Sequence, residues 1–341
     1  MQLLRVNASL EPRWDEYVRS RTLTVTDLAG WRHVLRQAYG LPSHFFVALD
    51  ADAVVGAMGL FEVKHPLFGH YLTTAAFSND GGLYHDRPDV RDLLVTEARR
   101  LADELDVAYL LIRTRGVELD GFDVDRHYRT ALIDLEGGAD SVWKDTLKSK
   151  ARNQVRRGRG EGFTVHAGHD QLRAFCQVFH RHMRDLGSPA HGFGFYEAIV
   201  EHLSDRARFV VVRDGERPVA GALLFEVNGT VSNHHTVALK QYNRRCPNYL
   251  IYWDMISQSC ARGNRLFDMG RSEEGSSQLR FKTNWGARVE GLSYNYYLRK
   301  LDRIPYVDPR NPKYRIPVAV WKRLPVRLTR SLGPHLIKGL A

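Results

Sequence analysis

The stretch LFDMGRSEEGSSQLRFKTNWG, residues 266–286, decides how this chain is interpreted. It begins with a short apolar run that predicts a strand. Two acids and Gly275-Ser276-Ser277 separate that strand from FKTNWG, which we expect in a loop that has a strand on each side. A connection held by a strand on each side is where a rigid scaffold usually presents its chemistry. The candidate site residues gathered here are Asp268, Arg271, Ser272, Lys282 and Trp285. A solvated hairpin connection can hold the same residue types, but their density around one strand end favours a site.

Length and composition indicate a two-domain protein of the cytoplasm. A chain of 341 residues is long for one hydrophobic core. No apolar run approaches the length of a membrane-spanning helix, and the start MQLLRVNASLEPRW lacks the basic and apolar regions of a signal peptide. The three cysteines lie far apart without a CxxC pair, which is typical of buried thiols in a reducing compartment.

The order of patterns predicts two α/β units. Turn residues Asp50 to Asp52 between Phe45–Leu49 and Ala53–Phe61 predict a hairpin, and the apolar run Val107–Ile112 predicts a strand covered on both faces. Pro247 opens a predicted helix that Gly263 closes. The remaining predicted elements are strands near His70–Ala75, Phe209–Val212, Pro218–Val227, Thr230–Val237 and Leu266–Met269, a helix over Val90–Leu105, a basic helix from Ser141 to Gly158 or Gly160, and Val289–Leu298 as the strand that completes the second sheet.

The excess of positive charge lies in the last segment of the chain. Residues 299–341 hold eleven Lys or Arg and two Asp, a net charge of +9, whereas the whole chain carries +10. A protein that coats nucleic acid would spread its charge over a folded face. The apolar residues Trp321, Leu324, Leu328, Leu332, Leu336 and Leu340 recur at helical spacing among these cations. We expect this stripe to pack on the second domain, and the alternative is that it lies on an anionic membrane surface.

FDMGRS followed by LRFKTNWG resembles the late signature of FemAB-type aminoacyl and acyl transferases, most closely the branch found beside exosortase and exopolysaccharide genes. LFGHYLTTAAFSNDGG at 67–82, LKSKARNQVRRGRGEGF at 147–163 and CPNYLIYWDMI at 246–256 match in the same order, so the resemblance covers about residues 30–298. It implies an α/β fold with two GNAT-type acyltransferase domains. We place them at 1–135 and 136–300, followed by a basic amphipathic tail at 301–341.

The resemblance implies that Lys282, in the FK motif, polarises the carbonyl of an activated acyl donor, since a fixed cation beside a tetrahedral oxyanion lowers the barrier. Asp80, in the loop FSNDGG, is the candidate general base, although Asp is also favoured in Gly-rich turns for backbone reasons. Arg113, Arg271, Asp268, Ser272, Trp285 and Asn248 are candidate substrate-binding residues, with Arg113 and Arg271 as anion clamps and Asp268 alternatively holding Arg271 in place.

Lys148, Arg152 and Arg156 form a cationic stripe on the predicted basic helix. They could bind phosphates of a tRNA acceptor stem or a nucleotide sugar, or they could form an ordinary solvated helix face.

We expect no metal and no tightly bound cofactor. The residues His180, His182, His234 and His235 have no acidic or thiol partner at ligand spacing. Gly158-Arg159-Gly160 lacks the residue that precedes Gly-x-Gly in the usual acyl-CoA pyrophosphate loop, which weighs against an ordinary acetyl-CoA enzyme. No insertion between 168 and 206 is long enough for the helical-hairpin arm of peptidoglycan-branching members, which weighs against tRNA as donor.

The predicted function is therefore an acyl or aminoacyl transferase that acts on an amine or hydroxyl of a cell-envelope precursor. Its donor would be aminoacyl-tRNA, acyl-ACP or acyl-CoA, and an anionic membrane surface is a further candidate partner through the tail. The alternatives are an N-acyl amino acid or sugar acyltransferase, and a non-catalytic factor for polysaccharide assembly.

Overall fold

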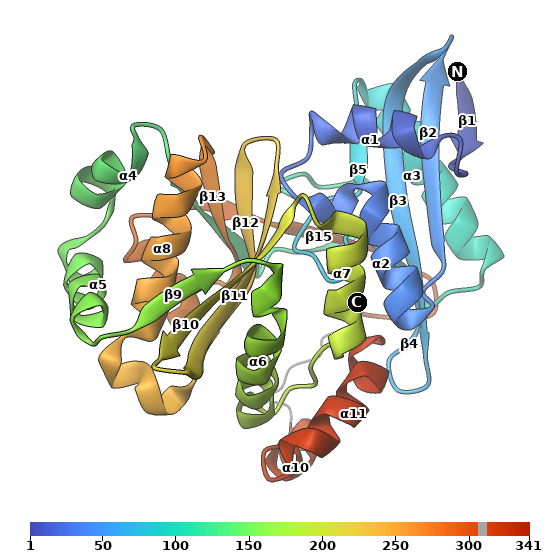
Figure 1. The fold of residues 1–341 in the computed structure, drawn as a ribbon. Helices are drawn as coiled ribbons and strands as arrows, with labels where there is room; N and C mark the ends of the chain where they lie inside the picture. Colours follow the sequence, from blue (N-terminus) through green and yellow to red (C-terminus); the bar gives the residue numbers. More distant parts are fainter. Residues whose placement is uncertain (306–311) are drawn as a thin grey trace. The chain divides into compact units, whose positions relative to one another are not determined.

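The computed structural model describes residues 1–305 and 312–341, so 306–311 of the predicted tail lie outside the described residues. The described residues form two compact units. The first holds Met1–Tyr128, 290–305 and Leu336–Ala341, and the second holds Arg129–Val289 and 312–335. Each unit contains a mixed β-sheet with helices packed against it (Figure 1), which confirms the predicted α/β class. The predicted domain bounds at 135 and 300 stay predictions.

The first sheet has the strand order β1-β2-β3-β4-β6-β15-β7, with β5 paired to β3. Its strands are β1 (Gln2–Arg5), β2 (Ser43–Asp50), β3 (Ala53–His65), β4 (Gly69–Thr73), β5 (Leu83–His85), β6 (Tyr109–Thr114), β7 (Asp123–Asp125) and β15 (Ser293–Leu298), and the helices of this unit are α1 (Glu11–Arg19), α2 (Ala29–Tyr39) and α3 (Pro88–Glu104). The apolar face of α3 packs on this sheet through Leu94, Ala98 and Leu101, which are buried at helical spacing. The predicted hairpin and the predicted helix 90–105 are confirmed by β2, β3 and α3.

The second sheet has the order β14-β8-β13-β12-β11-β10-β9. Its strands are β8 (Tyr128–Asp134), β9 (Thr164–Ala167), β10 (Ala207–Asp214), β11 (Arg217–Val227), β12 (Thr230–Ala238), β13 (Leu266–Glu273) and β14 (Arg288–Gly291), and the helices are α4 (Gly138–Ser141), α5 (Ser149–Gly160), α6 (Leu172–Leu186), α7 (Phe193–Leu203), α8 (Pro247–Ala261), α9 (Ser277–Thr283), α10 (Pro312–Trp321) and α11 (Val326–Ile337). Pro247 stands in the first turn of α8, as predicted.

Three predictions about elements are wrong. The segment 289–298 does not complete the second sheet, because β15 pairs with β6 and β7 of the first sheet and only β14 joins the second. The basic helix is not continuous: a π-helical turn over Val142–Thr146 ends at Leu147, whose extended ψ of 129° separates it from α5. The connection between β13 and β14 is not a plain loop, because FKTNWG begins in α9, whose N-terminus is capped by Ser276 through a bond from the Leu279 amide to Oγ.

Candidate active site

The second sheet opens at the carboxyl ends of β12 and β13. These parallel neighbours pair only over Thr230–Ser232 and Leu266–Asp268, although β12 continues to Ala238 and β13 to Glu273. Past the third pair, the backbone groups of one strand no longer bond to the other. An opening at the carboxyl ends of strands is where α/β sheets usually bind ligands.

A pocket of about 500 Å³ lies at the end of β12. Its lining includes the carboxyl end of β12, Asn248 and Tyr252 from α8, and Phe281 from α9. The rings of Tyr252 and Phe281 lie 5.3 Å apart, and the fully buried Trp285 stacks on Tyr249 at 5.8 Å. Asn248 therefore lies in the pocket wall as a ligand-binding residue would, whereas Trp285 supports the aromatic side of that wall from within the core.

Lys282, next to Phe281 on α9, is buried with 7% of its surface exposed. Its Nζ donates to the carbonyl oxygens of Gly270 and Arg271 on β13, at 2.7 and 2.9 Å. An ammonium group has three N–H donors, so one remains without an acceptor in the described part of the chain. The alternative that Lys282 points outward from a strand edge is excluded by its place on a helix and its burial.

Burial lowers the pKa of Lys282 to about 8, while the nearby Asp268 raises it and Arg271 lowers it. At neutral pH the side chain is therefore still mostly charged. A buried cation with one uncommitted N–H can donate to an oxygen that becomes negative during acyl transfer.

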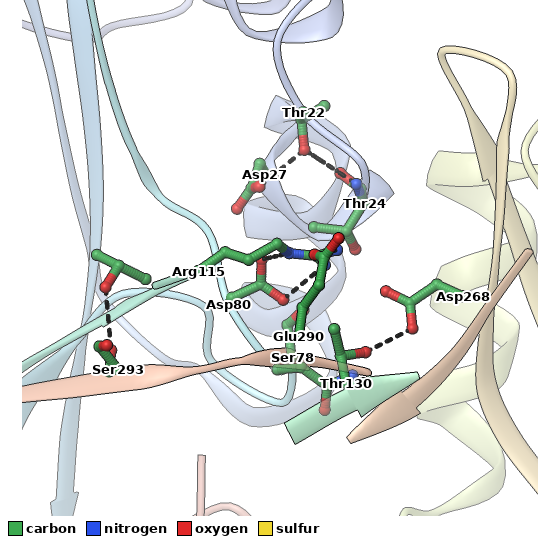
Figure 2. A network of polar contacts seen from close by, with 12 residues as sticks. Thr22, Thr24, Asp27, Ser78, Asp80, Arg115, Thr130, Asp268, Glu290 and Ser293 are labelled. Atoms are coloured by element: carbon green, nitrogen blue, oxygen red, sulfur yellow. Dashed lines mark hydrogen bonds and ion pairs between the residues drawn. The ribbon is translucent and has the colours of Figure 1, made fainter. Parts of the chain in front are cut away.

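Asp268 holds the end of β13 in place. Its Oδ1 accepts a bond from Thr130 Oγ1 at 2.7 Å (Figure 2) and another from the Gly270 amide at 2.7 Å. Arg271 is exposed, whereas Ser272 is buried and its Oγ has no hydrogen-bond partner among the described residues. Thr130 was missed by the sequence reasoning, because nothing near it in the chain marks a site.

In the first unit, Asp80 forms a two-pronged ion pair with Arg115, with both Nε–Oδ2 and Nη2–Oδ1 at 3.1 Å (Figure 2). Arg115 also reaches Glu290 at 3.6 Å. A paired Arg fork occupies both carboxylate oxygens, so a role of Asp80 as base requires that this pair opens. Arg113 donates through Nη1 to the carbonyls of Ala75 and Ser78 and so holds the loop that carries Asp80. Asp80, Arg113 and Arg115 line a pocket of about 200 Å³.

Asp27, which the sequence reasoning did not select, lies buried behind this loop. Its carboxylate accepts bonds from Thr22 Oγ1 at 2.9 Å and from the hydroxyl of Tyr84. Burial is the main cause that raises the pKa of Asp27 to about 7, and the charge of Asp80 adds to it. Gly81, with φ of +125°, leaves room for this carboxylate, since a Cβ there would collide with it. The Gly-rich loop is therefore built over a buried acid.

We predict that Asp27→Asn flattens the pH dependence of the stability of the first unit. The wild-type carboxyl binds its proton more tightly when folded, so the stability it provides is present below pH 4 and is lost as pH rises toward 7. Between pH 5 and pH 8 this loss is about 2–3 kcal/mol, and the variant should not show it. Hydrogen exchange of peptides from the first unit measures the difference, and equal slopes in both proteins would contradict the assignment.

The structure gives the three residues of the predicted phosphate stripe different surroundings. Arg152 donates from Nη1 to the carbonyls of Trp143, Lys144 and Leu147, at 3.0, 2.9 and 2.7 Å, and so caps the π-helical turn. Arg156 is exposed and lies over the Trp143 ring at 5.5 Å, and Lys148 is exposed at the N-cap of α5. Phosphate binding stays a prediction for Lys148 and Arg156. In Arg152, Nη1 already donates to backbone carbonyls of the π-helical turn, so this nitrogen stabilises the fold.

Comparison with known proteins supports the fold and part of the function. Residues 145–283 match the acetyltransferase (GNAT) domain family. No curated protein matches the chain. Among solved structures, the chain is similar to FemX at a TM-score of 0.68 with 14% identity, covering 88% of this chain and 98% of that one. It is also similar to L-PGS from Bacillus licheniformis (TM-score 0.58, 15% identity, 94% and 98% covered) and to a tandem GNAT protein from the clavulanic acid biosynthesis pathway (0.57, 11%, 87% and 98%).

These similarities confirm the tandem GNAT-like α/β architecture that the sequence predicted. The matched segment lies in the second unit and includes Lys282. The chain thus carries a GNAT acyltransferase domain, which confirms the predicted enzyme class at the level of that domain.

Proposed function

We propose that this protein transfers an acyl or aminoacyl group to an amine or hydroxyl of a cell-envelope precursor, with Lys282 as the group that stabilises the oxyanion. The observation that carries the proposal is the geometry of Lys282. It is a buried cation with two donors fixed on β13 and a third N–H that has no acceptor among the described residues, and its neighbour Phe281 lines the pocket at the end of β12.

The donor in this proposal reaches Lys282 through the pocket beside Asn248 and Tyr252. A donor carbonyl whose oxygen accepts the free N–H would be polarised before attack and stabilised after it. Aminoacyl-tRNA, acyl-ACP and acyl-CoA all present such a carbonyl. The exposed cations Lys148 and Arg156 would favour a donor with phosphates.

The acceptor, in this proposal, is a peptidoglycan-like or exopolysaccharide-linked precursor met in the cytoplasm. The motif resemblance to the exosortase-associated branch favours the exopolysaccharide choice. In the first unit, the pocket with Arg113 and Asp80 offers positive and negative side chains for a polar acceptor. An N-acyl amino acid or sugar acyltransferase is the second candidate, supported by the absence of an insertion between 168 and 206 long enough for the helical-hairpin arm of peptidoglycan-branching members.

The test is a transfer assay with purified protein and each of the three donor classes, together with mass spectrometry of small molecules that co-purify with it. The proposal expects one donor class to label an amine or hydroxyl acceptor. Tight co-purification of an intact polysaccharide fragment, with no transfer from any donor, would instead support the non-catalytic assembly factor.

We predict an alkaline limit of activity set by Lys282. The rate should fall as pH rises above about 8, because the lysine then loses the proton that it donates. Asp268→Asn removes a charge that raises the pKa of Lys282, so this limit should move to lower pH. The pH profile of kcat/KM measures the shift, and Glu273→Gln, at an exposed acid of the same strand, is the matched control. An alkaline limit that stays in place in Asp268→Asn would remove Lys282 from this role.

A further inference from the structure

The helices α10 and α11 are held against the second unit by specific contacts. Trp321 Nε1 donates to the Ser188 carbonyl at 3.1 Å, and Arg184 donates to the Leu324 carbonyl at 3.0 Å. On α11, Thr329 and Gly333 are buried, and a Cβ at Gly333 would meet the backbone of Ala190 at 2.7 Å. The anchored side of α11 is therefore its small-residue side.

The large apolar side chains of the two helices stay in solvent. Ile316 and Val320 of α10 are 74% and 51% exposed, and Leu328 and Leu332 of α11 are 50% and 48% exposed. Each pair is four residues apart, so its members share one helix face. The prediction that the leucine stripe packs on the second domain is wrong for Leu328 and Leu332, because Thr329 and Gly333 occupy the contact instead.

The chain segment that holds these exposed residues carries positive charge and no acid. Residues 316–341 contain five cations, namely Lys322, Arg323, Arg327, Arg330 and Lys338, and no Asp or Glu. Arg323 and Arg327 are exposed, and Arg327 directly precedes Leu328. The tail surface, which we define as Ile316, Val320, Arg323, Arg327, Leu328 and Leu332, thus combines exposed apolar side chains with cations and contains no acid.

We propose that the tail surface docks on an anionic lipid bilayer, with its apolar side chains in the headgroup region and its cations beside lipid phosphates. Apolar side chains favour the acyl boundary, and each nearby cation adds attraction to anionic lipid. A second copy of this chain is a poor occupant, because two surfaces with cations and no acids repel each other. No helix in the described part of the chain is long and apolar enough to span a bilayer, so the docking is peripheral.

The biological purpose of this docking rests on the proposed function, because a transferase held at a bilayer would meet an acceptor carried on a lipid. The physical binding, however, depends on the tail surface alone. Lys282 lies on α9 and contributes nothing to that surface, so binding and turnover can be measured separately.

The experiment uses the full-length chain and vesicles of phosphatidylcholine with or without phosphatidylglycerol, separated by flotation. Wild type should float with the anionic vesicles and stay in solution with the neutral ones. The double variant Leu328→Ser/Leu332→Ser should bind at least tenfold more weakly, since half-exposed leucines can still bury substantial apolar area. Arg323→Gln/Arg327→Gln should also weaken binding and reduce its dependence on salt.

Leu67→Ser is the matched control, because Leu67 is 70% exposed on the β3–β4 turn of the first unit. It should float like wild type, as should Lys282→Ala even if that variant has no activity. The proposal is overturned if the wild-type protein does not float with anionic vesicles, or if the tail variants float with them to the same extent as Leu67→Ser. Loss of self-association in the leucine variant without any vesicle binding would overturn it in favour of an interface between copies.

Discussion

Lys282→Ala should lower kcat/KM by roughly 10²–10³, the loss expected when one donor to a developing oxyanion is removed. The residue meets the structural requirement, because its ammonium group is buried, is fixed by Gly270 and Arg271, and has one N–H without an acceptor in the part of the chain that the structure describes. Lys282→Arg should restore little, since a planar guanidinium is larger and cannot bond to both carbonyls and a third oxygen in the same geometry. Steady-state kinetics with the identified donor measures both variants.

Stability separates a catalytic loss from a folding loss. The lowered pKa corresponds to a net cost of about 3 kcal/mol for keeping this charge in the folded protein, mainly from burial, whereas each hydrogen bond from a charged donor contributes about 1.5–3 kcal/mol. The cost of the buried charge and the gain from its hydrogen bonds offset much of each other. Lys282→Met, which keeps the length of the side chain, should therefore have a melting temperature close to that of the wild type and should lose its activity. A Lys282→Met protein that folds and keeps near-full turnover would end the catalytic assignment.

Acid should destabilise the second unit through its buried histidines. Burial lowers the pKa of His234 to about 4 and that of His191 and His235 well below the ordinary value. His235 lies 4.8 Å from the Phe179 ring and 5.7 Å from His191, with its Nε2 buried and without a partner among the described residues. These rings are neutral in the folded state. As pH falls, the same histidines therefore bind protons at a higher pH in the unfolded chain than in the folded protein.

The sign follows from the depressed values. Above pH 6.5 the histidines are neutral in both the folded and the unfolded state, so they cause no loss of stability. As pH drops toward 4 the stability falls, by about 3 kcal/mol for His234 alone. His234→Gln should remove that share of the acid loss, and His166→Gln, at an exposed position on β9, should not. Denaturant unfolding across this pH range, followed by hydrogen exchange in the second unit, measures it. Equal acid losses in wild type and His234→Gln would contradict the explanation.

The sequence predicted what local patterns determine. The α8 start at Pro247, the hairpin around Asp50–Asp52 and the strands β10 to β12 follow from turn chemistry and apolar periodicity, and all three are present. Lys282 was selected because the resemblance placed a lysine in the FK motif. The structure adds its burial and its bonds to β13, which no local pattern specifies.

What the sequence did not predict depends on partners distant in the chain. The raised pKa of Asp27 depends on its burial beside Thr22, Tyr84 and the Gly81 loop, and Tyr84 is 57 residues away. The break at Leu147 carries no Pro or Gly, and its stabilisation by Arg152 depends on a guanidinium reaching back to three carbonyls. The strand pattern of 289–298 was correct, but an apolar alternation does not say which sheet will accept the strand.

The placement of β15 constrains how the protein is made. Asn295 of this strand donates to the Ile112 carbonyl on β6, 183 residues earlier, and β15 stands between β6 and β7 rather than at an edge. Ribosomes deliver the N-terminal residues first, and closing so long a loop carries a large entropic cost before its contacts form. The pairing of β6 on that side must therefore wait until residues 293–298 have emerged. Translation that stops before Ser293 would leave an open strand edge, so a stalled or truncated product should be prone to aggregate.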